Sequence, residues 1–169
     1  VFNRIARTMY RITHSAIVVM IIAAMLFAVV YLEGVLYLAP CPLCMVNRGL
    51  LLIMALISLA AAIHNPTGSL RWLYSGLSLL IALAGMAVAG RHIWLQGLPP
   101  DKVPECGPDL AYMLDAFPLT DVIMRLIQGS GQCAEVSWTL LGLSLPQQTL
   151  LLLIVLSGMA IYAHIKSSR

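Results

Sequence analysis

Charged side chains are scarce in this chain of 169 residues: Asp, Glu, Lys and Arg make up 10% of it, against about 25% in a typical soluble domain. Acidic residues are absent before Glu33 and after Glu135. Hydrophobic residues make up 60% of the sequence, where a soluble domain has about 45–50%. So little polar surface excludes a soluble globule, a disordered tail and a nucleic-acid-binding module. The composition therefore predicts a protein that lies in a lipid bilayer.

Charge is missing altogether from several long apolar runs. Ser15–Leu32 and Trp72–Gly90 contain no charged residue, and neither do Gly49–Ile63 and Val136–Ala163. A helix that spans a membrane needs about 20 mostly apolar residues. Pro146 interrupts the last run, and Ser144 and Gln147 around it have the spacing of a helix-capping box. We expect transmembrane helices at about 15–33, 43–63, 71–92 and 146–165, within a single membrane domain of residues 1–169.

The segments between these helices differ greatly in length. The short connections, about 34–42 and 64–71, predict antiparallel neighbours. The connection at about 93–145 is long, and within it Leu119–Gln128 has apolar residues on one helical face and Asp121 and Arg125 on the other. That pattern is typical of a short helix lying on a membrane surface. The expected fold is an all-α membrane protein, an antiparallel bundle of four transmembrane helices with a long loop between the third and the fourth.

The few charges are divided between the two sides of the predicted membrane. Both termini and the 64–71 turn contain basic residues and no acid, whereas all seven acids fall on the other side. Because cytoplasmic loops are enriched in Lys and Arg, we expect cytoplasmic termini and a long loop on the outer side. A basic segment before an apolar run is also typical of a cleaved signal peptide. Cleavage is disfavoured here because Pro40 lies beside the only candidate site.

The four cysteines, Cys41, Cys44, Cys106 and Cys133, all fall on this outer side. Thiols tend to be oxidised outside the cytoplasm, so two structural disulfides are the simplest interpretation. Zinc is disfavoured, and we expect no metal, because zinc sites usually pair two closely spaced cysteine motifs and only Cys41 and Cys44 are closely spaced.

Cys41 and Cys44 form a C-x-x-C motif that is better suited to redox cycling than to stabilisation. A disulfide across two intervening residues restricts the unfolded chain little. The second thiol of such a motif is always at hand to resolve a mixed disulfide. Pro42 suits the first turn of a helix, so Cys44 should lie at a helix N-terminus, where the dipole favours a thiolate.

Arg48 follows Cys44 by four residues, and the two therefore share one helical face. A cation within a membrane helix is costly and by default suggests a function, although an arginine can also extend to the lipid headgroups. Arg91 and His92 end the third predicted helix on the same side, where an interfacial anchor is the simpler interpretation. Glu33 and Asn47 are interpreted as interfacial polar residues.

These motifs together resemble the DsbB family of bacterial inner-membrane disulfide-bond oxidoreductases. The resemblance rests on Pro40-Cys-Pro-Leu-Cys44, Arg48, Cys106 in a proline-rich segment, and the stretch from Gly131-Gln-Cys-Ala-Glu135 to Pro146. It covers nearly the whole chain. Well-known members often have an acid before the arginine and before the histidine, where this chain has Asn47 and Arg91. The resemblance implies a quinone as electron acceptor, and we expect these two departures to alter the affinity for the quinone or the potential of the site without stopping the chemistry.

The resemblance implies a two-electron route. A periplasmic DsbA-like thiol oxidase would attack a Cys106–Cys133 disulfide and form its mixed disulfide with Cys106, and the electrons would pass to Cys41 and Cys44. Cys44 would deliver them to a quinone of the membrane pool, ubiquinone or else menaquinone, bound beside Arg48, with His92 as a further contact. The implied location is the bacterial inner membrane, with the termini in the cytoplasm and the cysteines on the periplasmic side.

Two other functions are compatible with the same residues. Proteins resembling vitamin K epoxide reductase also combine two cysteine pairs, four helices and a quinone. They usually have their C-x-x-C near the last helix, whereas here it precedes the second. A structural membrane protein with inert disulfides is the alternative from a different class. Redox titration with a thioredoxin-like dithiol would separate it from an enzyme.

Overall fold

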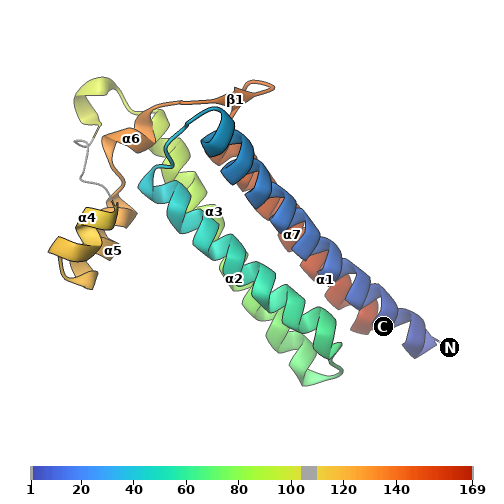
Figure 1. The fold of residues 1–169 in the computed structure, drawn as a ribbon. Coiled ribbons are helices and arrows are strands. Elements are labelled where there is room, and N and C mark those ends of the chain that lie inside the picture. Colours follow the sequence, from blue (N-terminus) through green and yellow to red (C-terminus); the bar gives the residue numbers. More distant parts are fainter. Residues whose placement is uncertain (1, 104–109, 169) are drawn as a thin grey trace.

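The computed structural model describes residues 2–103 and 110–168, most of which form helices (Figure 1). Four helices are long and apolar enough to cross a membrane. They are α1 (Phe2–Leu26), which continues into the π-helix η1 (Phe27–Val35), α2 (Pro42–His64), α3 (Ser69–Gln96) and α7 (Leu145–Ser168). The expected all-α, four-helix membrane fold is confirmed.

Helix boundaries follow from local sequence. Helix α2 begins at Pro42 and ends before Asn65, which adopts a left-handed conformation with φ of 41° and is followed by Pro66. Helix α7 begins beside the expected capping box, which forms only in part. The Ser144 backbone N–H donates to Gln147 Oε1 over 2.8 Å, but the Ser144 hydroxyl donates to Gln96 Oε1 of α3, also over 2.8 Å. This second bond ties the start of α7 to the end of α3.

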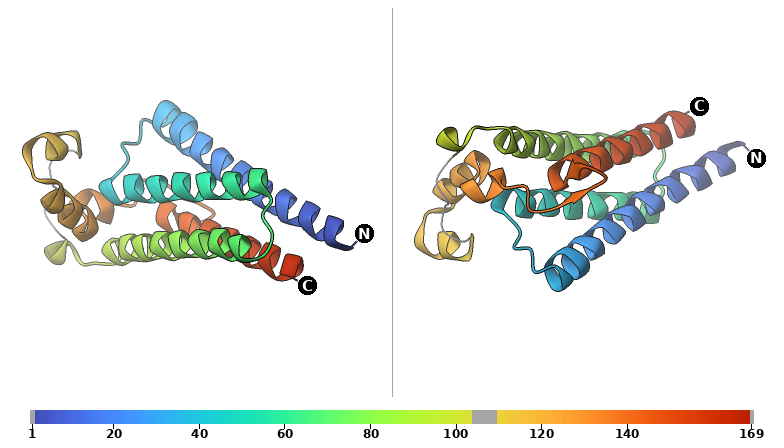
Figure 2. Two further views of the ribbon diagram at one scale, coloured as in Figure 1. Left: turned by 90° about the horizontal axis from the view of Figure 1, so that it is seen from below. Right: turned by 90° about the horizontal axis from the view of Figure 1, so that it is seen from above.

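The four long helices form a closed ring in which α1 contacts α2, α2 contacts α3, α3 contacts α7 and α7 contacts α1 (Figures 1 and 2). The centre contains buried side chains from all four helices: Ile17, Ile21, Leu51, Met54, Ala82, Leu153, Leu156 and Ala160. Gly85 allows α3 and α7 to approach closely, since a Cβ there would lie 2.9 Å from Leu153 Cδ1. Small residues at such contacts are typical of membrane helix packing.

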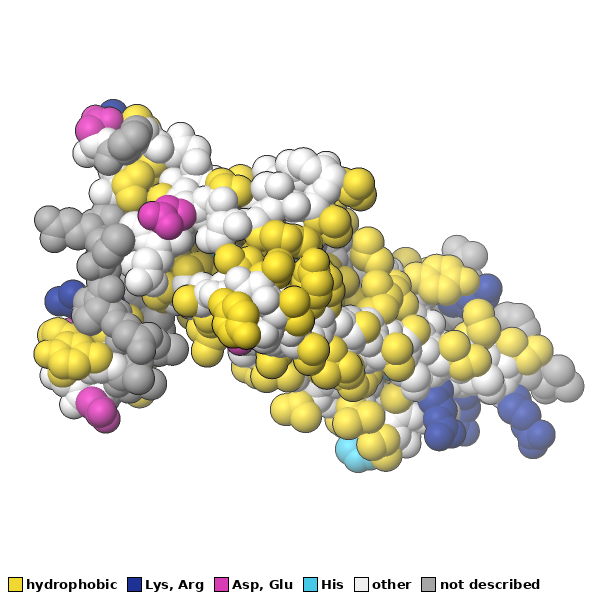
Figure 3. All heavy atoms as spheres, turned by 45° about the horizontal axis from the view of Figure 1, so that its top comes forward, with side chains coloured by type: hydrophobic (Ala, Val, Ile, Leu, Met, Phe, Trp, Pro, Cys, Tyr) yellow, Lys and Arg dark blue, Asp and Glu magenta, His cyan; other side chains and the backbone are white. Residues whose placement is uncertain are grey.

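We call the two ends of the bundle the cysteine end and the terminal end. The cysteine end is formed by the helix ends at Val35, Pro42, Gln96 and Leu145, and the terminal end by those at Phe2, His64, Ser69 and Ser168. In Figure 3 acidic side chains lie at the cysteine end, together with some basic ones, whereas the terminal end shows basic side chains, and a hydrophobic surface lies between the two ends. Many large apolar side chains on the long helices are exposed, which suits contact with lipid.

The segment between α3 and α7 folds over the cysteine end (Figure 1). Its elements are the short 3₁₀-helix η2 (Pro100–Lys102), the helices α4 (Leu110–Ala116), α5 (Leu119–Gln128) and α6 (Gly131–Ala134), and a hairpin of β1 (Thr139–Leu140) and β2 (Leu143–Ser144). Helix α5 has the bounds of the expected amphipathic segment, and its contact with a membrane surface stays a prediction. The hairpin turns at Leu141 and Gly142, both with positive φ, as a tight two-residue turn requires.

Candidate active site

The first part of the site is the N-terminus of α2. Cys41 is the N-cap residue, and its Sγ accepts the backbone N–H of Cys44 over 3.4 Å. The two sulfurs lie 3.0 Å apart as free thiols. Pro42, at the first helical position, has no backbone N–H to satisfy, which makes this short motif compatible with a helix start. The fold therefore presents both sulfurs at the positive end of the α2 dipole.

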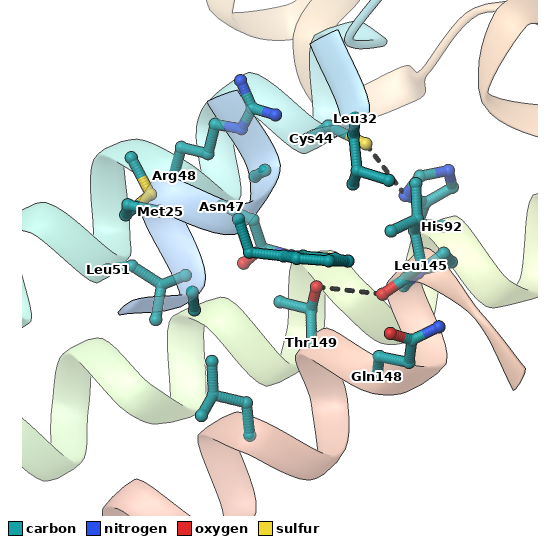
Figure 4. Close-up of a pocket in the computed structure, with 15 residues that line it drawn as sticks. Met25, Leu32, Cys44, Asn47, Arg48, Leu51, His92, Leu145, Gln148 and Thr149 are labelled. Carbon is teal, nitrogen blue, oxygen red and sulfur yellow. Dashed lines mark hydrogen bonds between the residues drawn. The ribbon is translucent and has the colours of Figure 1, made fainter. Parts of the chain in front are cut away.

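His92 projects from α3 towards these two sulfurs and lies beside both. The imidazole is buried, with Nε2 3.7 Å from Cys41 Sγ and Nδ1 4.0 Å from Cys44 Sγ. Figure 4 shows the contact with Cys44 at one end of a cavity. Helix α3 continues to Gln96, and the neighbouring Arg91 lies over the Trp94 ring at 4.3 Å, directed away from the cysteines by its place in the helix. His92 is therefore an internal residue of the site rather than a helix-end anchor.

Cys133 approaches the same point from α6. It is fully buried, and its sulfur, Cys41 Sγ and a His92 ring nitrogen all lie within 4.8 Å of one another. Its hydrogen bond with Cys41, followed by burial, raises the pKa of the Cys133 thiol, which therefore keeps its proton at neutral pH. From the sequence alone, Gly129-Ser-Gly131 predicts a flexible joint that would leave the neighbouring Cys133 exposed. The prediction of an exposed Cys133 is wrong for the described residues, because its side chain is fully buried.

Packing explains why Cys133 is buried. Cys41, Leu43, Leu95 and Cys133 form one cluster at the cysteine end. Gly129, with φ of 78°, lets the chain pass directly over it, because a Cβ there would lie 2.5 Å from Leu95 Cδ1. The glycine expected to act as a flexible joint is thus a point of close contact. Cys106, the fourth cysteine, lies outside the described residues.

Arg48 forms an ion pair with Glu33 of η1. Both side chains are mostly shielded, with 19% and 29% of their surface exposed. The interpretation of Glu33 as a merely interfacial residue is therefore wrong. An available signal was that Glu33 directly follows the uncharged run Ser15–Leu32, inside the first predicted helix, because an acid there needs a partner. The π-helical geometry of η1 is a further feature often found at functional sites.

Two cavities meet at this end of the bundle, and Leu32, Cys44, Arg48, His92, Leu145 and Pro146 line both. The inner cavity, of about 270 Å³, extends between the helices to Phe27, Leu51 and Leu152. The loop cavity, of about 300 Å³, extends to Glu33, Cys41 and Trp138. Cys44 is thus accessible from between the helices and from the loop.

Asn47 also lines the inner cavity (Figure 4). It is buried, and its Oδ1 has no hydrogen-bond partner among the described residues. Its interpretation as an interfacial residue is therefore wrong as well. No local sequence pattern distinguishes an interfacial Asn47 from a buried one, because its burial depends on how neighbouring helices pack around it.

The cysteines, His92, Arg48 and the cavities make this end of the bundle suited to thiol–disulfide exchange. The family model for the disulfide bond formation protein DsbB matches residues 10–163 of the chain. The chain belongs to the DsbB family.

Curated relatives are similar in sequence to this member of the DsbB family over most of their length. A disulfide bond formation protein B of Chromohalobacter salexigens is 50% identical over 130 residues, 76% of each chain. One of Hahella chejuensis is 42% identical over 163 residues, 96% of each chain. One of Saccharophagus degradans is 44% identical over 144 residues, 85% of this chain and 87% of its own. The chain is accordingly a multi-pass membrane protein with the role of a disulfide-forming oxidoreductase.

Proposed function

We propose that this protein reoxidises a periplasmic DsbA-like dithiol oxidase and passes the electrons through its two cysteine pairs to a membrane quinone. The observation that carries the proposal is the meeting of Cys41, Cys44, Cys133 and His92 at one point, where Cys44 and His92 line both cavities. Through Cys44 this group of sulfurs is accessible both from the loop segment and from between the membrane helices. A protein that only needed structural disulfides would have no use for that second access.

Transfer between the two pairs is supported by the contact of Cys133 with Cys41. Cys133 would be expelled as a thiolate when the Cys106–Cys133 disulfide is attacked, and before it takes up a proton it would attack Cys41 of a Cys41–Cys44 disulfide. A Cys133–Cys41 disulfide forms, the Cys41–Cys44 bond breaks, and Cys44 leaves as a thiolate. This exchange conserves the number of thiols and disulfides, so no further oxidant is needed. By the resemblance, Cys106 receives the partner protein and Cys133 is the thiol released by that attack.

The leaving sulfur has a favourable environment. Cys44 lies in the first turn of α2, where backbone N–H groups and the helix dipole favour a negative charge. His92 Nδ1 lies 4.0 Å from its sulfur and Arg48 follows one turn later. Cys44 also lines the inner cavity, so it is the thiol we assign to the exit of the electrons.

The inner cavity suits a quinone headgroup. Its walls are mainly apolar and come from the ends of η1, α2, α3 and α7. Arg48 and His92 offer hydrogen-bond donors to a carbonyl, and the Asn47 side chain adds a polar group to the cavity wall. When bound, a quinone supplies an acceptor for two electrons and two protons, and it reaches the site through the lipid. Asn47 takes the place of the acid that often precedes the arginine in this family.

The orientation we propose follows the charges. Arg4, Arg7, Arg11 and Lys166 lie towards the terminal end, and the positive-inside rule assigns that end to the cytoplasm. The cysteine end would then face the periplasm, where thiols are oxidised.

A quinone-reduction assay tests the proposal. Purified protein in lipid nanodiscs, with a reduced thioredoxin-fold dithiol and ubiquinone-1, should consume quinone and partner thiols in a ratio of one quinone to one dithiol. Menaquinone analogues in the same assay compare the two acceptors. Absence of thiol exchange with any such dithiol would leave a structural protein with inert disulfides as the better explanation.

A further inference from the structure

We propose that the reduced site binds one Zn²⁺ ion through Cys41, Cys133 and His92, and that the bound ion holds the cysteines in their reduced, inactive form. The binding rests on the geometry of these three side chains, whereas the inhibition rests on the proposed function. Spacing along the chain disfavours zinc because only Cys41 and Cys44 are close in sequence. Folding, however, brings together a different set of ligands.

The positions of the three ligand atoms suit a small ion. Cys41 Sγ lies 3.7 Å from His92 Nε2, and the ligand atoms of all three residues lie within 4.8 Å of one another. In a tetrahedral zinc site, bonds of about 2.3 Å to sulfur and about 2.0–2.1 Å to nitrogen put neighbouring ligand atoms roughly 3.5–3.8 Å apart. Side-chain adjustments of about 1 Å would complete the coordination shell.

The chemistry of the donors also fits zinc. Two thiolates and an imidazole are ligands of the soft and borderline type that zinc prefers. Two thiolates neutralise the charge of the ion, which matters because all three residues are buried. Cys44 Sγ, 3.0 Å from Cys41 Sγ, is the available fourth ligand. Binding releases the protons of the coordinating thiols and involves no electron transfer.

The site exists in only one redox state. A disulfide between Cys41 and Cys44, or between Cys41 and Cys133, removes the thiolates that zinc needs, so the oxidised protein has no comparable site. Zinc would therefore bind after electrons have entered and before they have left. Excess zinc should arrest the protein at that stage, since coordinated thiolates are unavailable for exchange.

Zinc binding to the purified protein tests this proposal without requiring turnover. Reduced and oxidised protein in nanodiscs would be titrated anaerobically with Zn²⁺ against a chromophoric chelator. We expect one ion per reduced chain. Zinc sites lose roughly 10–100-fold in affinity when a residue that supports a ligand is removed. The oxidised protein loses the ligands themselves, so its affinity for zinc should fall by at least this factor. Equal affinity in the two redox states would overturn the proposal.

Variants then identify the ligands. Cys133→Ser and His92→Ala should each weaken binding by at least the same factor. His64→Ala is the matched control, because His64 lies at the terminal end, where it contacts Tyr74, and its loss should leave zinc affinity unchanged. Cys44→Ser retains the three named ligands and should bind zinc more tightly than Cys133→Ser does. Because we expect Cys44→Ser to be inactive, this comparison separates failure of the zinc site from failure of the proposed function.

A measurement on the unaltered protein guards against misfolded variants. Zn²⁺ should protect Cys41 and Cys133 of the reduced protein from alkylation, as measured by mass spectrometry of their peptides. Alkylation of both cysteines at the same rate with and without zinc would rule the site out.

Discussion

Both ends of the bundle bury polar side chains, but among the described residues only the cysteine end combines them with reactive sulfur atoms and two adjoining cavities. At the terminal end Tyr10 and His14 are fully buried, with ring centroids 4.4 Å apart. The Arg71 guanidinium lies 4.9 Å from the centre of the Tyr10 ring, and His164 packs edge-on against Trp72 at 4.0 Å. These side chains stack on one another, and Arg71 also donates to the Pro66 carbonyl over 2.9 Å, so the contacts seen at this end are structural.

The cysteine end uses its polar groups differently. Its histidine faces two sulfurs, its arginine pairs with an acid, and both line cavities that also contain Cys44. By contrast, the cavity found on α1 near the terminal end is lined by Arg4, Ile5, Thr8 and Met9 and includes neither Tyr10 nor His14. A buried ionisable residue in a membrane helix suggests function by default. Buried ionisable residues occur at both ends, but at the cysteine end they lie beside reactive sulfurs that line cavities. A catalytic function is therefore assigned to the cysteine end.

Of the substitutions that test this comparison, Cys44→Ser should have the largest effect on activity. Loss of the thiol that lines the inner cavity should abolish quinone reduction by a reduced dithiol partner, while serine fills nearly the same space and preserves the helices. Quinone absorbance measures the first result and circular dichroism the second. Normal turnover by this variant would remove Cys44 from the exit we assign to it and would break the distinction between the two ends.

Arg48→Ala should raise the KM for quinone about tenfold, since a hydrogen bond to a charged group contributes about 1.5–3 kcal/mol. Both disulfides should still form, because the guanidinium pairs with Glu33 and makes no direct hydrogen bond to a sulfur among the described residues. The measurement is initial rate against quinone concentration, with thiol titration as the control. An unchanged KM would indicate that Arg48 only extends towards the headgroups.

Glu33→Gln is the matching test on the other side of that ion pair. In Figure 4 the Arg48 side chain extends away from Thr149 and Gln148. Removing the carboxylate charge should free Arg48 for the inner cavity and lower the KM for quinone by up to about fivefold, the equivalent of 1 kcal/mol for a partly exposed pair. A higher KM would mean that Glu33 orients Arg48 for binding instead of competing for it.

Gly129→Ala should have a smaller effect on activity, which arises from a shift in the position of Cys133. The new Cβ would meet Leu95 Cδ1 at 2.5 Å, and the positive φ disfavours any side chain. We expect slower reoxidation of the dithiol partner, with the reaction between Cys41–Cys44 and quinone unaffected. Gly142→Ala is the control, because Gly142 also has a φ of 78° but has open space around it. If both variants reoxidised the dithiol partner equally slowly, backbone strain alone would account for the loss of rate, and the contact with Leu95 would not be needed to position Cys133.

Much of this arrangement could be predicted from sequence because it depends on local signals. Uncharged runs indicated the four long helices, Pro42 indicated the start of α2, and the pattern of Leu119–Gln128 indicated helix α5. These features depend on residues a few positions apart. Hydrophobic periodicity and helix capping are sufficient to find them.

The contacts that form the site depend on residues far apart in the chain, and no local pattern encodes them. Cys133 lies against Cys41 because α6 packs over Leu43 and Leu95. Asn47 is enclosed by neighbouring helices, and Glu33 reaches Arg48 across the start of α2. The sequence therefore indicated which residues matter more reliably than which of them touch.

His14→Leu should have the smallest effect on activity and is the sharpest test of the terminal end. Both imidazole nitrogens of His14 are buried without a hydrogen-bond partner among the described residues. An unsatisfied buried polar group costs about 1–3 kcal/mol, so an apolar side chain of similar size should raise the melting temperature, by about 2–4 °C for a net gain of 1 kcal/mol. Thermal unfolding in detergent gives this value, and quinone reduction should stay unchanged. His92→Leu is the matched change at the cysteine end and should impair quinone reduction. If His14→Leu impaired turnover as much as His92→Leu, the terminal end would share in the chemistry and stacking could not be its whole role.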